Sequence, residues 1–109
     1  MANTFKLKTK ANVGVTTVGI YTAPAATTTV VIGITLANTS GSGVNVGVGI
    51  TRAGTTEDVK LLKNAPIPQG SSLEFMGGNK VVLEATDTVT VDSATNNSVD
   101  ASLTIMEIT

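Results

Sequence analysis

The sequence has no histidine, no cysteine and no tryptophan, and only 14% of its residues are charged. Without histidine or cysteine, the commonest catalytic bases, thiol nucleophiles and soft-metal ligands are missing, and no disulfide can form. No lysine stands at a recognisable catalytic spacing from a serine. Three aromatic residues (Phe5, Tyr21 and Phe75) are too few to line the sugar cleft of a glycosidase. We therefore expect a protein that is not an enzyme and has no cofactor.

Long apolar runs are also missing, and none approaches the length of a membrane span. The stretch 1–4 has no apolar core of the kind that a signal peptide needs. The net charge is −1, and the one basic cluster has neither a second basic patch nor an aromatic stacking platform beside it. We expect neither a membrane nor a nucleic acid as partner.

The chain does contain strict alternation of apolar and polar residues. Val44, Val46, Val48 and Ile50 alternate with Asn45, Gly47, Gly49 and Thr51, and similar patterns recur along nearly the whole chain. A period of two is typical of half-buried strands, and regular spacing with turn residues between strands is typical of a sandwich or barrel. The sequence predicts an all-β protein: a single antiparallel β-sandwich domain over 1–109, Ig-like or jelly-roll-like, with about eight or nine strands.

The strands are predicted at 4–10, 13–21, 28–38, 44–52, 59–63, 72–76, 80–85, 88–92 and 99–108. We expect 28–38 and 44–52 to form a central hairpin, 65–70 with its two prolines to be an unpaired extended crossing, and 77–79 to be a tight hairpin turn. The residues expected to point inward are Ile32, Ile34, Leu36, Val46, Val48, Leu83, Ala101, Leu103 and Ile105.

Two sets of residues superficially resemble ligand sites. Gly47 and Gly49 belong to no phosphate-binding motif, and we interpret them as a close backbone approach to the domain's own chain or to a neighbouring subunit. Hard oxygen ligands cluster near the last strands, but their spacing matches no calcium loop. We expect these residues to be solvated turn residues that bind no metal, and the alternative is a calcium site. They are Asp87, Asp92, Asn96, Asn97 and Asp100.

Residues 1–12 form a possible N-terminal arm or edge strand. Its lysines alternate with apolar residues, so on a strand they would share one solvent face. Either the segment pairs within its own sheet, as an edge protected by charge, or it adds a strand to a neighbour, with apolar side chains filling pockets. The second interpretation predicts that deleting 1–10 leaves a folded domain that attaches more weakly. The candidate partner contacts are Phe5, Lys6, Leu7, Lys8 and Lys10.

Longer stretches support a resemblance. The segments 21–25, 30–39, 64–74 and 79–87, with the closing alternation to 105–108, resemble small virion structural proteins of tailed bacteriophages, particularly those that infect marine cyanobacteria. The resemblance covers roughly 18–109 and carries no functional residues. It implies a β-sandwich assembled on a phage particle in the host bacterial cytoplasm, with the major capsid protein or other virion proteins as partners.

The resemblance favours a capsid decoration or cement protein, and the alternative is a tail, neck or fibre-associated adaptor. A different class of function is a host-surface adhesin that binds a glycan, with calcium held by Asp92, Asn96, Asn97 and Asp100. Low charge on a surface rich in threonine and glycine independently favours a homo-oligomer, since the cores of interfaces are depleted in charge.

Overall fold

The computed structural model describes residues 3–54, 57–75 and 80–109, with only the backbone at Phe75. Within these ranges the chain forms strands and connecting turns, and no helix that could cross a membrane. The nine strands are β1 (Asn3–Val13), β2 (Val18–Thr22), β3 (Thr28–Asn38), β4 (Val44–Arg52), β5 (Glu57–Ile67), β6 (Ser72–Phe75), β7 (Val81–Leu83), β8 (Thr88–Ser93) and β9 (Val99–Ile108).

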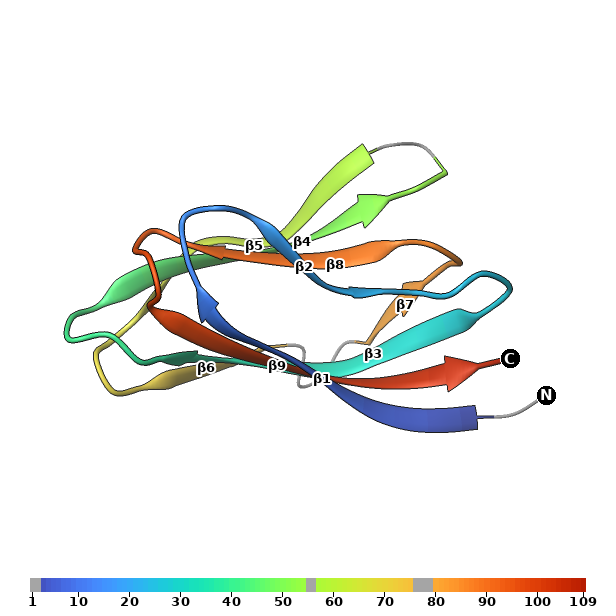
Figure 1. Cartoon of the computed structure of the whole chain (residues 1–109), viewed down its shortest axis with the longest axis horizontal. Helices are drawn as coiled ribbons and strands as arrows, with labels where there is room; N and C mark the ends of the chain where they lie inside the picture. The colour runs from blue at the N-terminus through green and yellow to red at the C-terminus, as the bar shows by residue number, and fades with distance from the viewer. Residues whose placement is uncertain (1–2, 55–56, 76–79) are drawn as a thin grey trace.

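The strands form two antiparallel sheets packed face to face, as Figure 1 shows. Sheet A has the order β1-β9-β3, with β6 and β7 following one another along the far edge of β3, and sheet B has the order β2-β8-β4-β5. The pairing is nested: β4 with β5, β3 with β6 and β7, β2 with β8, and β1 with β9. Such a rolled-up antiparallel ribbon is a jelly roll. The predicted β-sandwich is confirmed, and its strand order is jelly-roll-like rather than Ig-like.

The core between the sheets is almost entirely aliphatic, and Tyr21 is its one aromatic member among the described residues. Alternate residues of β4 and β9 turn inward, as a period of two requires. Nearly all of the expected core residues are buried, namely Ile34, Leu36, Val46, Val48, Leu83, Ala101, Leu103 and Ile105.

The prediction was wrong at Ile32, which is only half-buried, while its neighbour Val31 is in the core. The register of β3 against β9 shifts between Val31 and Gly33, so Ile32 is the extra residue of a β-bulge. One extra residue exchanges the two faces of a strand. Thr29 and Val31 therefore face the core before the bulge, and Ile34 and Leu36 face it afterwards.

The predicted hairpin between 28–38 and 44–52 is also wrong, because β3 lies in sheet A and β4 in sheet B. The turn between them crosses from one sheet to the other, and the Asn38 side chain fastens it. Asn38 Nδ2 donates hydrogen bonds to the carbonyl oxygens of Ser42 (2.8 Å) and Ile67 (3.0 Å). Two aliphatic strand faces can pack across a core as readily as they can lie side by side, so alternation alone did not distinguish these arrangements.

Three further expectations need correction. The strand expected at 13–21 begins only at Val18, since Val13 belongs to β1. The expected proline crossing is part of β5, where Pro66 stands opposite Asn45; β5 is an edge strand, which can accommodate a residue without an N–H group. The hairpin turn expected at 77–79 lies outside the described residues, and the strands beside it, β6 and β7, both pair with β3.

The close backbone approach expected at Gly47 and Gly49 is confirmed. A Cβ atom on Gly47 would lie 2.6 Å from Asp92 Oδ1, and one on Gly49 would lie 2.9 Å from the carbonyl oxygen of Val59. The chain's own neighbouring strands, β8 and β5, therefore provide the contact. Gly49 meets backbone, which leaves no room for a side chain, whereas Gly47 meets the end of the Asp92 side chain.

Candidate interaction surface

Strand β1 forms one edge of sheet A and pairs with β9 from Asn3 opposite Ile108 to Lys10 opposite Ala101. No strand of the described structure pairs with its other edge. The structure therefore has the first of the two expected arrangements, pairing within its own sheet. A free edge remains on the outer side of β1, where a neighbouring strand can add.

The lysines of β1 share one face, as expected, but that face is turned toward the sandwich interior. Lys6 Nζ lies 2.9 Å from Glu107 Oε1, and Lys8 Nζ lies 6.0 Å from the centre of the Tyr21 ring. Lys6 and Lys10 are nevertheless exposed to solvent, as expected, and only Lys8 is half-buried. At the rim of the sandwich, the long stems reach inward over apolar surface while the side chain of Lys6 remains 42% exposed.

Glu107 connects the lysine to a buried polar cluster. Its side chain is only 8% exposed and accepts a hydrogen bond of 2.6 Å from the Tyr21 hydroxyl, which also lies 2.8 Å from Thr29 Oγ1. Sequence reasoning missed this cluster, although a signal was present. The alternation that turns Leu103 and Ile105 inward also turns Glu107 inward.

The cluster holds its groups in their usual protonation states at neutral pH. Hydrogen bonds from Lys6 and Tyr21 lower the pKa of Glu107, so its carboxylate stays charged. Burial, reinforced by the hydrogen bond to Glu107, raises the pKa of Tyr21 to about 12. Neither group is poised to exchange a proton near neutrality, so the arrangement ties β1, β2, β3 and β9 together rather than serving acid–base chemistry.

The opposite face of β1 turns apolar side chains to solvent. Phe5 is 68% exposed and Leu7 is 65% exposed. Phe5 stands opposite Met106, which stands opposite Val30, which in turn stands opposite the exposed Val82. One apolar row thus runs across four strands on the outer face of sheet A. We call Phe5, Met106, Val30 and Val82 the apolar row.

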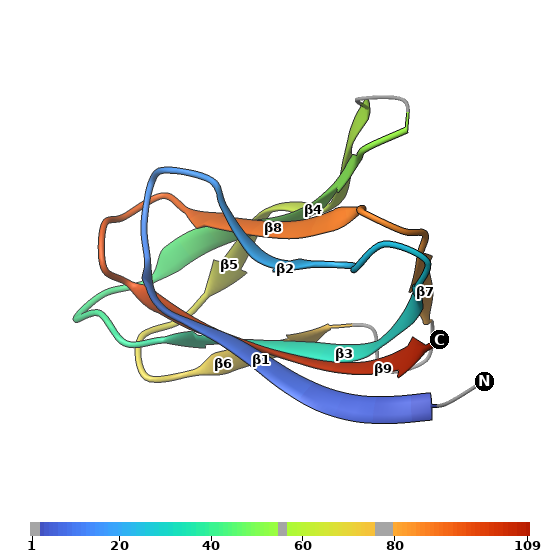
Figure 2. The same ribbon diagram turned by 45° about the vertical axis from the view of Figure 1, so that its right-hand side comes forward.

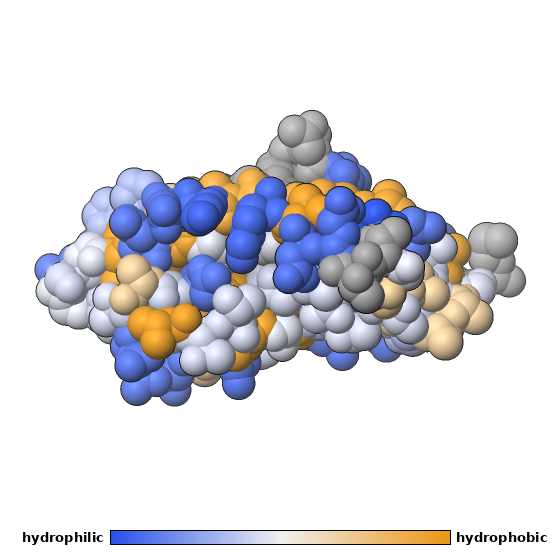
Figure 3. All heavy atoms as spheres, turned by 90° about the horizontal axis from the view of Figure 1, so that it is seen from above, coloured by the Kyte–Doolittle hydropathy of each residue, from blue (hydrophilic) through white to orange (hydrophobic). Residues whose placement is uncertain are grey.

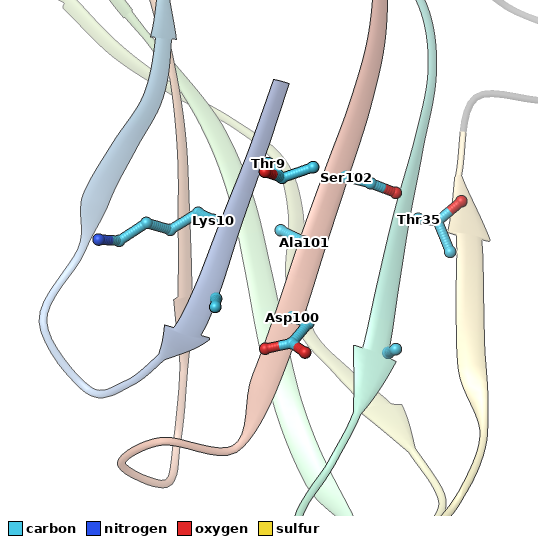
Figure 4. Close-up of a pocket in the computed structure, with 8 residues that line it drawn as sticks. Thr9, Lys10, Thr35, Asp100, Ala101 and Ser102 are labelled. Atoms are coloured by element: carbon cyan, nitrogen blue, oxygen red, sulfur yellow. The ribbon is translucent and has the colours of Figure 1, made fainter. Parts of the chain in front are cut away.

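Further along the same face lies a shallow hollow of about 300 Å³. The register places Thr9, Ser102 and Thr35 in one line across its floor. Figure 4 shows the Lys10 side chain extending away from the other labelled residues, so small side chains line most of the site. We call Thr9, Ala11, Thr35, Ala37 and Ser102 the small-residue hollow.

The outer face of sheet B is more polar. Figure 3 looks onto this side of the molecule and shows hydrophilic side chains gathered over much of it. Lys60 Nζ lies 3.8 Å from Asp92 Oδ2, to which the Thr17 hydroxyl donates a hydrogen bond of 3.0 Å. Phe5 and Leu7, which were expected as partner contacts, are the most exposed large apolar side chains of the described structure, and both lie on sheet A.

The oxygen ligands considered for calcium do not converge on one site. Asp87 pairs with Arg52, at 3.0 Å between Oδ2 and Nε, while Asp100 Oδ1 accepts a hydrogen bond from the backbone of Asn12. Asn96 Oδ1 accepts a bond from the backbone of Val15. No group of three or more acidic side chains in the described ranges could hold a metal ion.

Comparison with known proteins shows similarity at the level of structure only. No protein-family model matches the chain, and no curated protein sequence matches it. A chain of the Bacillus endospore appendages, described as a novel family of disulfide-linked pili, has a TM-score of 0.57 at 17% identity, over 99% of this chain and 87% of that one.

Two viral structures also share the fold. A chain of the cyanophage Pam1 capsid asymmetric unit has a TM-score of 0.53 at 15% identity, over 96% of this chain and 84% of that one. A chain of an IBDV viral particle has a TM-score of 0.55 at 12% identity, and the match spans only 30% of that longer chain. At these identities the similarity establishes the jelly-roll sandwich and nothing more.

Proposed function

We propose that this chain is a non-enzymatic structural protein of a virus particle, and that it is a capsid decoration or cement protein of a bacteriophage. Its partners would be the major capsid protein and further copies of itself, in a virion assembled in the host bacterial cytoplasm. The observation that carries the proposal is the outer face of sheet A, where Phe5 and Leu7 are exposed on β1. Exposed apolar patches of this kind mark surfaces that bind other proteins.

The use of the ionisable groups supports a structural role. Glu107 and Tyr21 are held by hydrogen bonds between strands. Asp87 pairs with Arg52 and also accepts a hydrogen bond from the backbone of Glu84 at 3.0 Å. The most buried ionisable groups of the described structure therefore serve to fasten strands and turns. In the hollow on sheet A, no hydrogen bond of the described structure joins a hydroxyl to Lys10 or Asp100.

The comparisons favour a capsid over a pilus. The matched cyanophage chain is similar in length to this one and belongs to a capsid asymmetric unit. The matched Bacillus appendage is described as disulfide-linked, and this sequence has no cysteine with which to form such a link. A tail, neck or fibre-associated adaptor would place the same fold elsewhere on the particle, and the experiment below distinguishes these locations.

The decisive experiment is electron cryo-microscopy of purified particles with this chain located in the map. We expect copies on the outside of the head, in contact with the major capsid protein. Particles assembled without the protein should lose their genome at a lower temperature, and adding the purified protein should restore the original value. Density confined to the tail or neck, or unchanged thermal release without the protein, would refute a decoration role.

A further inference from the structure

We propose that the outer face of sheet A binds a second copy of this chain, face to face, about a two-fold axis that crosses the strands at the level of Lys8. This contact goes beyond the proposed function, because it depends only on the geometry of the face. It would make a symmetric dimer, or one dimeric contact within a larger assembly.

The face contains two halves of complementary shape. On one side of the Lys8 level, Phe5 and Leu7 project from the sheet, followed by the rest of the apolar row. On the other side, the small-residue hollow occupies the same strands, β1, β9 and β3. A projecting half and a recessed half on one rigid face allow the surface to match a copy of itself.

A two-fold axis across the strands reverses position along each strand and keeps β1 above β1. Positions equally far from Lys8 then meet, so Phe5 of one copy lies over Ala11 of the second, and Leu7 lies over Thr9. Each contact is made twice, as an isologous interface requires. The Phe5 ring would enter the hollow, where the small side chains leave room for it.

The few charges on this face fit the same axis. Glu74 stands opposite Thr35, on the hollow side of the axis. Lys80 directly precedes Val81, which stands opposite Val31 on the projecting side. Both lie along the outer side of β3, so the two-fold operation brings Lys80 of one copy toward Glu74 of the second. The same operation would place Asp100 of one copy over Met106 of the second, with Asp100 Oδ1 still accepting its hydrogen bond from the backbone of Asn12.

The area is sufficient for a stable pair. Four strands spaced about 4.8 Å apart, over about ten residues of about 3.3 Å each, present roughly 600 Å² per copy. Two copies would bury roughly 1,200 Å² in total, which reaches the lower end of specific protein interfaces. The face is suited to a second copy of this chain, because it carries both the apolar row and the small-residue hollow that would receive it.

Sedimentation equilibrium of the full chain at several concentrations tests the proposal. We expect the wild-type protein to dimerise, and Phe5→Glu to weaken the dimer about 30-fold or more, since buried aromatic anchors dominate interfaces. Ala11→Lys should weaken it similarly by obstructing the hollow. The double variant should recover much of the affinity, because the introduced carboxylate of each copy would face the introduced ammonium of the other.

Val15→Glu is the matched control, since Val15 is exposed but lies in the turn between β1 and β2, where its backbone alone bonds to Asn96. It should leave the dimer unchanged, and urea midpoints should show that all variants fold. A wild-type monomer at about 0.5 mM, or a dimer insensitive to Phe5→Glu, would overturn the proposal. If the protein is a monomer and needs Phe5 to attach to the particle, the face binds the shell protein and the dimer proposal is overturned. If the double variant dimerises no more tightly than the single variants, the two-fold register is overturned.

Discussion

Glu107 lies on the core face of β9, in line with Leu103 and Ile105, and is a charged residue at a position where a strand of this pattern usually carries an aliphatic one. Its burial is tolerated because Lys6 compensates the charge and Tyr21 donates a second hydrogen bond to the carboxylate. The residue alternation predicted that Glu107 points inward. It did not predict the partners, which come from strands far away in the sequence.

Tyr21→Phe tests the value of the cluster. The substitution leaves a buried carboxylate and the Thr29 hydroxyl without one hydrogen bond, which should lower the free energy of unfolding by about 1–3 kcal/mol. Thr22→Ala in the same strand is the control, because it removes an exposed hydrogen bond to Thr88 and should cost less than about 0.5 kcal/mol. Urea denaturation at neutral pH measures both, and equal losses would mean that the cluster adds nothing.

The pKa shifts predict how stability depends on pH. The pKa of Glu107 is lowered by folding, so its stabilisation is present above the unfolded value of about 4.3 and is lost as the pH falls through the folded value. The pKa of Tyr21 is raised to about 12, so its stabilisation is present below about pH 10 and is lost as the pH rises toward 12. Urea midpoints from pH 7 down to pH 2 should fall less in Glu107→Gln than in the wild type, and parallel curves would contradict the assignment.

The bulge in β3 separates two isoleucines that the alternation had placed together. Ile34→Ala should lower the free energy of unfolding by about 2–5 kcal/mol, as expected for a fully buried side chain. Ile32→Ala deletes the same atoms from a half-buried position and should cost clearly less. Equal losses in denaturant titrations would show that Ile32 is in the core and that the bulge lies elsewhere.

At the scale of elements, strand limits were easier to predict than strand partners. The limits 28–38, 44–52 and 99–108 agree with β3, β4 and β9, because glycine, serine and asparagine mark the turns beside them. Alternation shows which residues share a face, but not which strand lies alongside or across the core. The assignment of β3 and β4 to opposite sheets therefore had no signal in either strand alone.

The candidate site was predicted in part for the same reason. Phe5 and Leu7 were expected to share a face of β1, and they do. That the opposite face, which carries Lys6, turns toward the sandwich interior depends on the pairing with β9, where Glu107 binds Lys6. The small-residue hollow needs three strands in register, so no local pattern could reveal it. Sequence reasoning found residues that share a face and missed surfaces that are assembled from several strands.

The pairing of β1 changes the expectation for an N-terminal truncation. Deleting 1–10 would remove most of the hydrogen-bonded pairing with β9 and would also remove Lys6, which pairs with Glu107. It would leave β9 as an exposed edge of sheet A. We now expect an unfolded or strongly destabilised chain, rather than a folded domain that only attaches more weakly. Circular dichroism and urea titration of the truncated chain would decide between them, and a native-like transition would restore the view of a detachable arm.

At the scale of the whole molecule, a single aliphatic core lies between the two sheets and receives side chains from both. We therefore expect the chain to unfold in one cooperative step, as one domain over 1–109. Calorimetry should give an enthalpy of about 75 kcal/mol near 60 °C, on the average of about 0.7 kcal/mol per residue. Two resolved transitions, or a calorimetric enthalpy well above the van't Hoff value, would show that the sheets unfold separately.

The nested pairing also has a consequence for the order of folding. Figure 2 shows the start of β1 and the end of β9 at the same end of the molecule, and the hydrogen bond from Tyr21 to Glu107 joins positions 86 residues apart. Among the paired strands of the described ranges, only β4 and β5 are neighbours in the chain, and each successive nested pair encloses a longer loop. Closing longer loops costs more entropy, so the ribbon is expected to zip outward from β4 and β5, and slowly. During synthesis β1 must wait for β9, and until then its Phe5 and Leu7 are attached to no sheet.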